Sequence, residues 1–325
     1  MDVASERASL IEKINNVEAK TFMSVSEQVF SYQMKYNNLF ASFVKNTRQE
    51  FPVFLPISAF KHHEVMTGNW LPQKTYRSSG TTASVTSSHL IRDESYYLKH
   101  AEELFSEAFG PIQDYTILAL LPHYLEREDS SLIAMVNHLM SKSDRRHSGY
   151  FLYDYKALQE TLMECKSAGK KTMLIGVSYA LLDFVDVYKF PFPGLTIMET
   201  GGMKGRRREM PREELHAVLQ KAFHLEHICS EYGMTELLSQ CYSKKNGIYY
   251  FSKTMRVMIT EINDPYYFMP NGKNGVMNII DLANLDSCAF IATEDLGIVH
   301  DDKAFSVLGR LDNSDLRGCN LLIGD

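Results

Sequence analysis

A run of small and hydroxyl-bearing residues lies between Tyr76 and Ser88, reading Tyr-Arg-Ser-Ser-Gly-Thr-Thr-Ala-Ser over 76–84 with Thr86 and Ser87 after it. Small residues let backbone N–H groups approach an anion, and the hydroxyl groups can donate hydrogen bonds to it. This composition predicts a loop that holds phosphate groups, with an ordinary surface loop as the alternative. The pattern GxxxxGK[ST] is absent from the chain, so the loop is not a Walker A loop.

A second segment that could do chemistry is Cys-Ser-Glu-Tyr-Gly-Met-Thr-Glu at 229–236. In it, Tyr232 offers a flat ring, Thr235 a hydroxyl group and Glu236 a carboxylate close to a glycine. Together these groups suit a base, a phosphate and a divalent cation, since Mg²⁺ prefers oxygen ligands. The alternative is a strand that ends in a turn.

Two more segments nearer the C-terminus carry charged residues beside glycines. Thr-Glu-Asp-Leu-Gly (293–297) puts Asp295 before a glycine that we expect in a turn. Leu-Gly-Arg-Leu-Asp (308–312) should direct Arg310 outward from the end of a strand. Neither segment identifies a function by itself.

The elements that must position these residues alternate between strand and helix from Tyr76 onward. Short apolar runs indicate strands, and amphipathic periods between them indicate helices. The expected strands are 116–122, 148–154, 172–178 and 194–202, and the expected helices are 130–142, 157–170 and 211–223. This alternation predicts parallel βαβ units and an α/β fold.

The two ends of the chain differ from this middle part. Residues 1 to about 50 have apolar residues at helical spacing, and beyond about residue 245 the helical periods stop and strands joined by turns follow. We therefore expect a helical lead-in packed on the main body (1–75), an α/β core (76–245) and a β-rich part (246–325).

Composition excludes several classes of protein. The 325 residues include 34 Lys+Arg and 40 Asp+Glu, with 45% hydrophobic residues, which is ordinary for a folded protein and excludes a disordered or collagen-like chain. Five cysteines without CxxC spacing favour free thiols over disulfides or a zinc site. The net charge of −6 argues against a nucleic-acid partner. Without a signal sequence or a long apolar stretch, we expect a cytoplasmic protein with no membrane span.

In their order along the chain, the four segments resemble the motifs of the adenylate-forming superfamily of acyl-CoA synthetases, luciferases and peptide-synthetase adenylation domains. Ser-Ser-Gly-Thr-Thr resembles the phosphate loop, Glu-Tyr-Gly-Met-Thr-Glu the Tyr-Gly-x-Thr-Glu motif, Thr-Glu-Asp-Leu-Gly the ribose-binding motif and Gly-Arg-Leu-Asp the hinge motif. Glu-Thr-Gly-Gly-Met-Lys-Gly (199–205) falls where the family has its adenine-contacting glycine loop. The resemblance spans about residues 75 to 320 and implies the fold of the family's large N-terminal domain, with two α/β subdomains and a β-rich C-terminal part.

The resemblance also implies a role for each matching residue, with ATP and Mg²⁺ as cofactors. Thr235 would contact the α-phosphate, Glu236 would ligate Mg²⁺, and Asp295 would accept the ribose hydroxyls with Arg310 beside it. Those implied to hold the phosphates are Ser78, Ser79, Gly80, Thr81 and Thr82, and those implied to hold the adenine are Gly201, Gly202, Tyr232 and Gly233. A carboxylate would attack the α-phosphorus through an anionic transition state, releasing pyrophosphate and leaving an acyl-AMP.

The sequence departs from the family in two ways. Ala83 stands where a glycine is usual, and no lysine follows soon after, so Lys74 and Arg77 are candidates to neutralise phosphate. The printed chain also ends seven residues after Gly318, before the small domain that carries the family's adenylation lysine. We expect that domain to be lacking, as it is in the LuxE-type acyl-protein synthetases of bacterial fatty-acid reductase systems.

The tail Arg-Gly-Cys-Asn-Leu-Leu-Ile (317–323) is similar to the tail of those synthetases, where a cysteine near the C-terminus accepts the acyl group. That resemblance implies an acid-thiol ligase of the long-chain-fatty-acid–protein ligase type, in which Cys319 receives a carboxylic, fatty acyl group for delivery to an acyl-CoA-reductase-type partner. The resemblance to the wider superfamily also implies that His123 lies near the substrate carboxylate, with a structural histidine as the alternative. We assign the other four cysteines to packing.

Three other functions remain open at this stage. One is a CoA or aryl-acid ligase of the same superfamily, and another is a pseudoenzyme subunit that retains the fold but not the reaction. The third is a serine hydrolase, because Gly-Val-Ser-Tyr-Ala (176–180) follows an expected strand and has the local context of a nucleophile elbow at Ser178, with His300 downstream.

Overall fold

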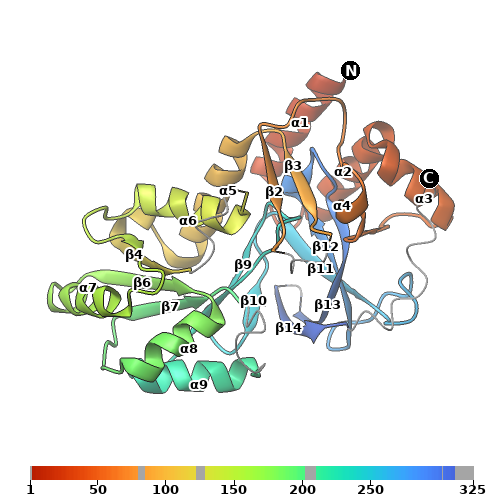
Figure 1. The fold of residues 1–325 in the computed structure, drawn as a ribbon. Helices are drawn as coiled ribbons and strands as arrows, with labels where there is room; N and C mark the ends of the chain where they lie inside the picture. Colours follow the sequence, from red (N-terminus) through yellow and green to blue (C-terminus); the bar gives the residue numbers. More distant parts are fainter. Residues whose placement is uncertain (1, 80–84, 122–128, 202–209, 302, 312–325) are drawn as a thin grey trace. The chain divides into compact units, whose positions relative to one another are not determined.

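The computed structural model describes residues 2–79, 85–121, 129–201, 210–301 and 303–311. Contacts within the chain divide it into two units (Figure 1). The first unit consists of residues 1–100, 233–240 and 250–325, and the second of residues 101–232 and 241–249. The predicted three-part division, with borders at residues 75 and 245, stays a prediction.

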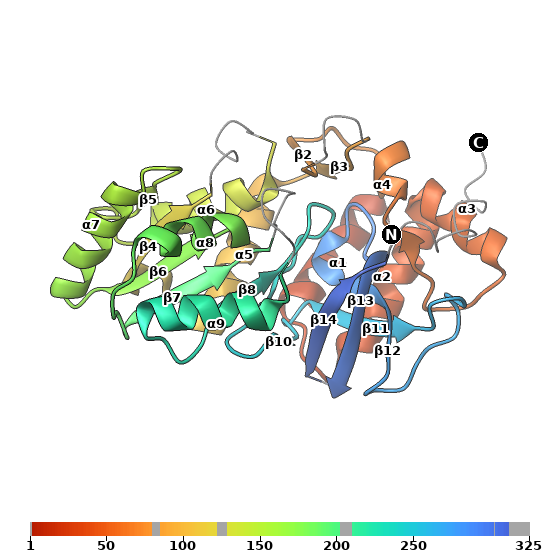
Figure 2. The same cartoon turned by 60° about the horizontal axis from the view of Figure 1, so that its bottom comes forward.

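The second unit contains a largely parallel sheet with helices on both faces (Figure 2). Five strands run parallel in the order β8-β7-β6-β4-β5, and β9 pairs antiparallel with β8. The strands are β4 (Tyr115–Leu120), β5 (Gly149–Tyr150), β6 (Lys171–Gly176), β7 (Leu195–Glu199), β8 (Cys229–Tyr232), β9 (Cys241–Ser243) and β10 (Ile248–Tyr250). The helices are α6 (Ser131–Lys142), α7 (Tyr155–Ser167), α8 (Ser178–Val187) and α9 (Arg212–Phe223), and α5 (Glu94–Phe109) contributes residues to both units.

Continuous apolar runs explain these parallel strands. Every residue of β4 is buried, as are all residues of β6 except Lys171, which is the pattern of strands covered on both faces. The helices begin where polar caps precede them: the Asp154 side chain accepts a hydrogen bond from the N–H of Ala157 at 3.0 Å, and Pro211 precedes α9. The predicted α/β fold is therefore confirmed.

The strand order reverses direction between β4 and β6. From β4 the chain passes through α6 to β5 on one side, whereas from β6 it passes through α8 to β7 on the other. Sheets of this kind bind ligands at such a switch point, beyond the carboxyl ends of the strands. The predicted residue Ser178 follows β6 and begins α8.

The first unit is built around an antiparallel sheet in the order β11-β12-β13-β14, with β1 parallel to β13. A separate hairpin joins β2 to β3. The strands are β1 (Leu55–Pro56), β2 (Lys74–Arg77), β3 (Ser88–Ile91), β11 (Met255–Thr260), β12 (Asn274–Asp281), β13 (Phe290–Asp301) and β14 (Ala304–Arg310). The helices are α1 (Val3–Asn15), α2 (Phe22–Tyr36), α3 (Asn38–Thr47) and α4 (Ala59–His62), with a short 3₁₀ helix η2 (Leu282–Asn284) after β12.

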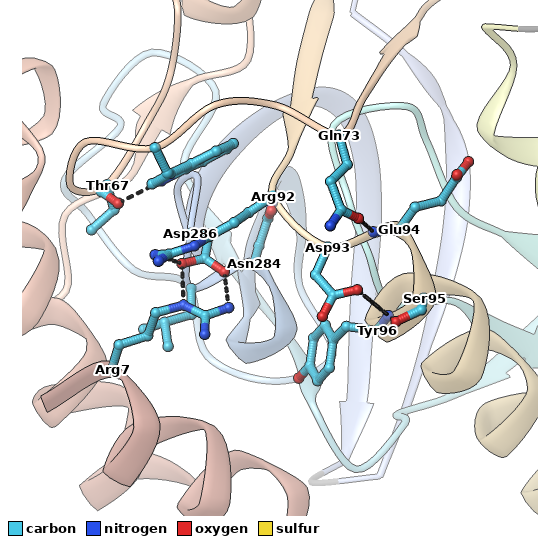
Figure 3. A network of polar contacts seen from close by, with 12 residues as sticks. Arg7, Thr67, Gln73, Arg92, Asp93, Glu94, Ser95, Tyr96, Asn284 and Asp286 are labelled. Atoms are coloured by element: carbon cyan, nitrogen blue, oxygen red, sulfur yellow. Dashed lines mark hydrogen bonds and ion pairs between the residues drawn. The ribbon is translucent and has the colours of Figure 1, made fainter. Parts of the chain in front are cut away.

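The N-terminal helices pack on this sheet through aromatic rings. The Phe290 ring on β13 lies 5.2 Å from that of Phe30 and 5.9 Å from that of Phe40, between ring centroids. A polar contact supports the same packing: Arg7 on α1 makes a bidentate ion pair with Asp286, which Arg92 also contacts at 3.2 Å (Figure 3). The ion pair between Arg7 and Asp286 therefore connects the loop after η2 to α1.

The role expected for Gly297 was wrong. The glycine was predicted in a turn after Asp295, but it lies inside β13, next to a shift in register against β14. A Cβ atom there would come within 2.6 Å of Met277 Sδ and 2.7 Å of the Ser306 carbonyl oxygen. The glycine is thus required for close approach of neighbouring chain segments.

Two other expectations concern cysteines and membranes. Cys165, Cys229, Cys241 and Cys288 are free and buried, as predicted for packing residues. Burial raises the pKa of Cys229 to about 11 and that of Cys288 to about 12, so these thiols are protonated at neutral pH. Across the described ranges, no helix combines the length and hydropathy that a membrane span requires.

Candidate nucleotide-binding site

In the first unit, hydrogen bonds join the residues at the two ends of the predicted phosphate loop. The N–H of Ser78 donates to the Ser87 carbonyl oxygen at 3.1 Å, and the N–H of Ser87 donates to Ser78 Oγ at 2.9 Å. This pair continues the β2–β3 hairpin, whose last rung is Arg77 opposite Ser88. Ser79 beyond it is exposed. The base of the predicted loop is therefore held by two hydrogen bonds between Ser78 and Ser87.

The carboxyl group of Glu236 lies next to the base of this loop. Glu236 is only 5% exposed, and the Ser87 side chain donates a hydrogen bond to its carboxylate. Burial raises its pKa, while the Ser87 hydrogen bond and the charges of Arg310 and Lys61 oppose the rise. Lys61, on α4, carried no motif and was missed by the sequence analysis.

These surroundings fit Mg²⁺ bound through ATP. Within the residues that the structure describes, no cluster of three or more His, Cys, Asp or Glu could hold a metal ion. Mg²⁺ needs no such cluster, because it is usually held by one or two carboxylates, substrate phosphates and water. A single buried carboxylate that is costly to keep charged would be stabilised by a cation beside it.

The backbone of Thr235 and Glu236 is held by two buried side chains. His89 Nδ1 lies 2.8 Å from the Thr235 carbonyl oxygen, and Asn284 Nδ2 donates to the Glu236 carbonyl oxygen at 2.7 Å. The next residues are held by Asp281, which accepts from the N–H groups of Leu238 and Ser239 at 2.8 and 3.0 Å. His89 and Asn284 were also missed by the sequence analysis.

Asp295 and Arg310 form a cross-strand pair in the same unit. They lie opposite each other on β13 and β14, and Arg310 Nε donates to Asp295 Oδ1 at 3.2 Å. The N–H of Asp295 donates to Thr293 Oγ1 at 3.0 Å. Arg310 ends β14, as predicted, and its charge acts to lower the pKa of Glu236. The first unit thus groups Ser78, Glu236, Asp295 and Arg310 around the β2–β3 hairpin and the end of β14.

The second unit holds the start of the predicted adenine loop. Gly201 follows β7 with φ +76°, and its N–H donates to Glu199 Oε1 at 2.7 Å. Ser178 Oγ donates to the same oxygen at 2.6 Å, and His216 Nε2 lies 3.9 Å from the other carboxylate oxygen. Although burial opposes it, the hydrogen bonds from His216 and Ser178 and the charge of Arg212 hold the pKa of Glu199 below its usual value. The Glu199 carboxylate therefore holds the backbone of Gly201, near the start of the predicted adenine loop.

Tyr232 lies at the end of β8, in the strand that the sequence analysis gave as the alternative, and the residue is only 7% exposed. It packs edge-on against Tyr249 with ring centroids 5.8 Å apart. The preceding Glu231 is half-buried near the charge of Glu199, and the loss of hydration above all raises the pKa of Glu231 to about 8. Gly233, which follows Tyr232, is exposed and belongs to the first unit.

Several predicted residues cannot be located in this site. Gly80, Thr81, Thr82, Gly202, His123 and Cys319 lie outside the described residues. Their roles stay predictions from the sequence.

Several solved structures that resemble this fold are acid–CoA ligases. A 2-hydroxyisobutyryl-CoA ligase superposes with a TM-score of 0.60 over 91% of this chain and 76% of its own, at 11% identity. O-succinylbenzoate-CoA synthetase from Bacillus subtilis, solved with ATP and magnesium, gives 0.51 over 73% of this chain and 49% of its own, at 15% identity. ATP-bound MatB from Rhodopseudomonas palustris gives 0.52 over 73% and 47%, at 14% identity. The fold is that of the adenylate-forming enzymes, as the order of the motifs predicted.

Among curated proteins, the chain is similar to a long-chain-fatty-acid–luciferin-component ligase from Vibrio harveyi. The two are 26% identical over 192 residues, which are 52% of this chain and 48% of the relative. The match thus spans about half the length of that relative. The predicted resemblance to LuxE-type enzymes is confirmed by this similarity, and no family model matches the chain.

Proposed function

We propose that the protein is an ATP- and Mg²⁺-dependent acid-thiol ligase that activates a fatty acid as acyl-AMP and transfers the acyl group to a protein thiol. The observation that carries this proposal is the chain of contacts in the first unit from Ser78 through Ser87 to Glu236. It joins the predicted phosphate loop to the predicted Mg²⁺ ligand, with the cations Arg310 and Lys61 close by. The similarity to a fatty-acid ligase supports the acid substrate.

The proposed first step is attack of the acid's carboxylate oxygen on the α-phosphorus. A bond forms between that oxygen and phosphorus, the bond to the pyrophosphate oxygen breaks, and pyrophosphate leaves. Mg²⁺, when bound, would offset the negative charge on the phosphates. Glu236 would hold the ion, Thr235 would donate to the α-phosphate, and Asp295 would accept from the ribose hydroxyls. Preorganised groups of this kind stabilise the charge that develops in the transition state.

The proposed second step transfers the acyl group to Cys319. Its thiolate attacks the acyl carbonyl carbon, the bond to the phosphate oxygen breaks, and AMP leaves. The thioester stays activated for delivery, and a reductase-type protein is the partner we propose. The four described cysteines do not suit this role, because all are buried and burial raises the pKa of Cys165, Cys229 and Cys288.

Intact-protein mass spectrometry tests both steps. The protein is incubated with Mg²⁺-ATP and a panel of fatty and aryl acids, released pyrophosphate is assayed, and Cys319→Ser serves as the matched variant. We expect a hydroxylamine-labile acyl adduct on the wild type that is absent from Cys319→Ser, while pyrophosphate release persists in both.

Other outcomes identify the alternatives. Pyrophosphate release without an adduct, followed by thioester formation when CoA is added, would show a CoA ligase. An adduct only with aryl acids would change the substrate class. No pyrophosphate release and no ATP binding over the whole panel would contradict the proposal and favour a pseudoenzyme subunit.

A further inference from the structure

The segment that carries Thr235 and Glu236 is irregular, yet it is buried. Residues 233–240 form turns and bends between β8 and β9, and the run from Glu236 to Gln240 is buried throughout. Backbone carbonyl groups in such a segment have no strand or helix partner. Buried carbonyl groups nevertheless need hydrogen bonds, because leaving one unpaired costs free energy. Side chains from elsewhere in the chain must therefore supply the donors.

Two side chains do so at the functional pair itself. His89 Nδ1 donates to the Thr235 carbonyl oxygen, which can only accept, and Asn284 Nδ2 donates to the Glu236 carbonyl oxygen. The two side chains also meet, because His89 Nε2 lies 2.9 Å from Asn284 Oδ1. Each is only 1% exposed, so water does not compete for these contacts. Each of the two consecutive carbonyl groups is thus held by one side-chain donor.

His89 is placed by the same strand that supports the phosphate loop. It lies on β3 opposite Tyr76, and the Phe60 ring packs edge-on against it at 5.6 Å. Ser87, two residues earlier, donates to the Glu236 carboxylate. One short stretch of chain therefore holds Glu236 by its side chain and the neighbouring Thr235 by its backbone.

Asn284 is placed by a second set of contacts that reaches the N-terminal helices. Gln33 Nε2 donates to the carbonyl oxygens of Asn284 and Leu285 at 3.2 and 3.0 Å. Asp286 is held by Arg7 and Arg92, and Figure 3 shows Asn284 beside this cluster. The Asp286 carbonyl oxygen also accepts from the N–H of Thr67 at 2.8 Å. These contacts limit movement of the loop that presents Asn284.

We propose that His89 and Asn284 are positioning residues, which hold the Thr235–Glu236 backbone so that the hydroxyl and carboxylate groups face the nucleotide phosphates and Mg²⁺. This inference rests on the proposed function of Thr235 and Glu236. Neither His89 nor Asn284 is assigned contact with the substrate; each acts through the backbone of the pair. Misplacement of a reacting group by about 1 Å can cost about 100-fold in rate, so support of this kind matters for catalysis.

A pair of isosteric substitutions at His89 tests the proposal. The side-chain nitrogen of asparagine can take the place of His89 Nδ1, whereas that of glutamine can take the place of Nε2. His89→Asn should therefore keep the donor to the Thr235 carbonyl oxygen, and His89→Gln should lose it. We expect His89→Gln and Asn284→Asp to lower kcat for pyrophosphate release by about 10- to 100-fold, and His89→Asn to recover most of it.

A binding measurement separates positioning from general loss of stability. Calorimetric titration of ATP at several Mg²⁺ concentrations gives the Mg²⁺ concentration that half-maximal binding requires. We expect this value to rise several-fold in His89→Gln and Asn284→Asp. Phe43→Leu is the control, because Phe43 is a buried residue of α3 and the substitution loosens the first unit through its core.

The outcomes are distinguishable. If His89→Gln keeps the wild-type kcat and the wild-type Mg²⁺ concentration for half-maximal ATP binding, the two residues are merely structural. The same holds if His89→Gln changes both values no more than Phe43→Leu does at equal stability. In either case the inference is wrong. Equal losses in His89→Asn and His89→Gln would also contradict it. If the wild type neither binds Mg²⁺-ATP nor releases pyrophosphate, the proposed function itself fails and this inference fails with it.

Discussion

Arg310 and Asp295 lie opposite each other on adjacent strands, with Arg310 Nε 3.2 Å from Asp295 Oδ1. The exposed fractions of their side chains differ sharply. The Arg310 side chain is 76% exposed, whereas that of Asp295 is 9% exposed. An exposed cation in a surface ion pair contributes little to stability, because water screens the attraction. Arg310 therefore remains available to a ligand, while the strand pair keeps it next to the proposed ribose-binding carboxylate.

The first prediction concerns this arginine. Arg310→Gln should change the free energy of unfolding by less than about 1 kcal/mol, as expected for an exposed ion pair. It should weaken ATP binding by about tenfold, because a hydrogen bond to a charged group is worth about 1.5–3 kcal/mol. Denaturant unfolding and calorimetric ATP titration measure the two quantities. A large loss of stability with unchanged ATP binding would contradict the assignment.

Glu236→Gln should lower activity strongly without lowering the stability of the folded protein. Burial raises the pKa of Glu236, so the folded protein bears a cost for a charged carboxylate there, and the amide removes this cost. We expect unfolding stability to stay equal or rise, while pyrophosphate release falls at least about 100-fold, as for loss of other groups that stabilise transition-state charge. Thermal unfolding and a pyrophosphate assay test this, with Glu261→Gln as the control.

The sequence predicted the longer strands of the second unit and the helices α6, α7 and α9 well, because their apolar patterns are strong. The all-buried strand Tyr115–Leu120 is one apolar run. The sequence did not predict α5 or α8, and the expected strand 148–154 is only Gly149–Tyr150. The position of Gly297 was wrong, because a glycine needed for close packing looks the same in a sequence as one needed for a turn. The need for glycine at position 297 follows only from the tertiary structure, in which Met277 and Ser306 lie too close for a Cβ atom.

His89 and Asn284 could not be predicted for a different reason. Each is a single polar residue without a motif, and their contacts join positions 146 and 195 residues apart. Lys61 likewise acts on Glu236 from a short helix far away in the sequence. Motifs identified the residues that would touch the nucleotide, whereas the residues that support them depend on the tertiary fold.

Ser178→Ala discriminates the proposed ligase from a serine hydrolase. Ser178 Oγ donates to Glu199 at 2.6 Å, and that carboxylate also accepts from the N–H of Gly201. Loss of one donor to a buried carboxylate should cost about 1–3 kcal/mol of stability, but pyrophosphate release should fall less than about tenfold, since no catalytic bond is removed. Hydrolysis of a p-nitrophenyl ester by the wild type, abolished in Ser178→Ala, would support the hydrolase instead. Ser141→Ala, at an exposed helix position, is the control.

The last prediction concerns pH and the half-buried Glu231. Burial first, and the nearby charge of Glu199 second, raise its pKa to about 8 from 4.5. The folded protein therefore keeps Glu231 protonated at pH values where the unfolded chain has lost the proton. The stability contributed by this group is fully present below about pH 4.5 and is lost as pH rises towards 8.

Glu231→Gln should remove this dependence, because the amide stays neutral at every pH. We expect the variant to match the wild type in unfolding free energy near pH 5, and to exceed it at pH 8 by on the order of 2–4 kcal/mol, given about 1.4 kcal/mol for each unit of pKa difference. Denaturant unfolding from pH 5 to 8 measures this, with Glu226→Gln at an exposed position as the control. A constant difference across this range would show that Glu231 titrates normally. An advantage of the variant that grows steadily from pH 5 to pH 8 would establish that the folded protein holds this carboxyl group in its neutral form near the charged Glu199.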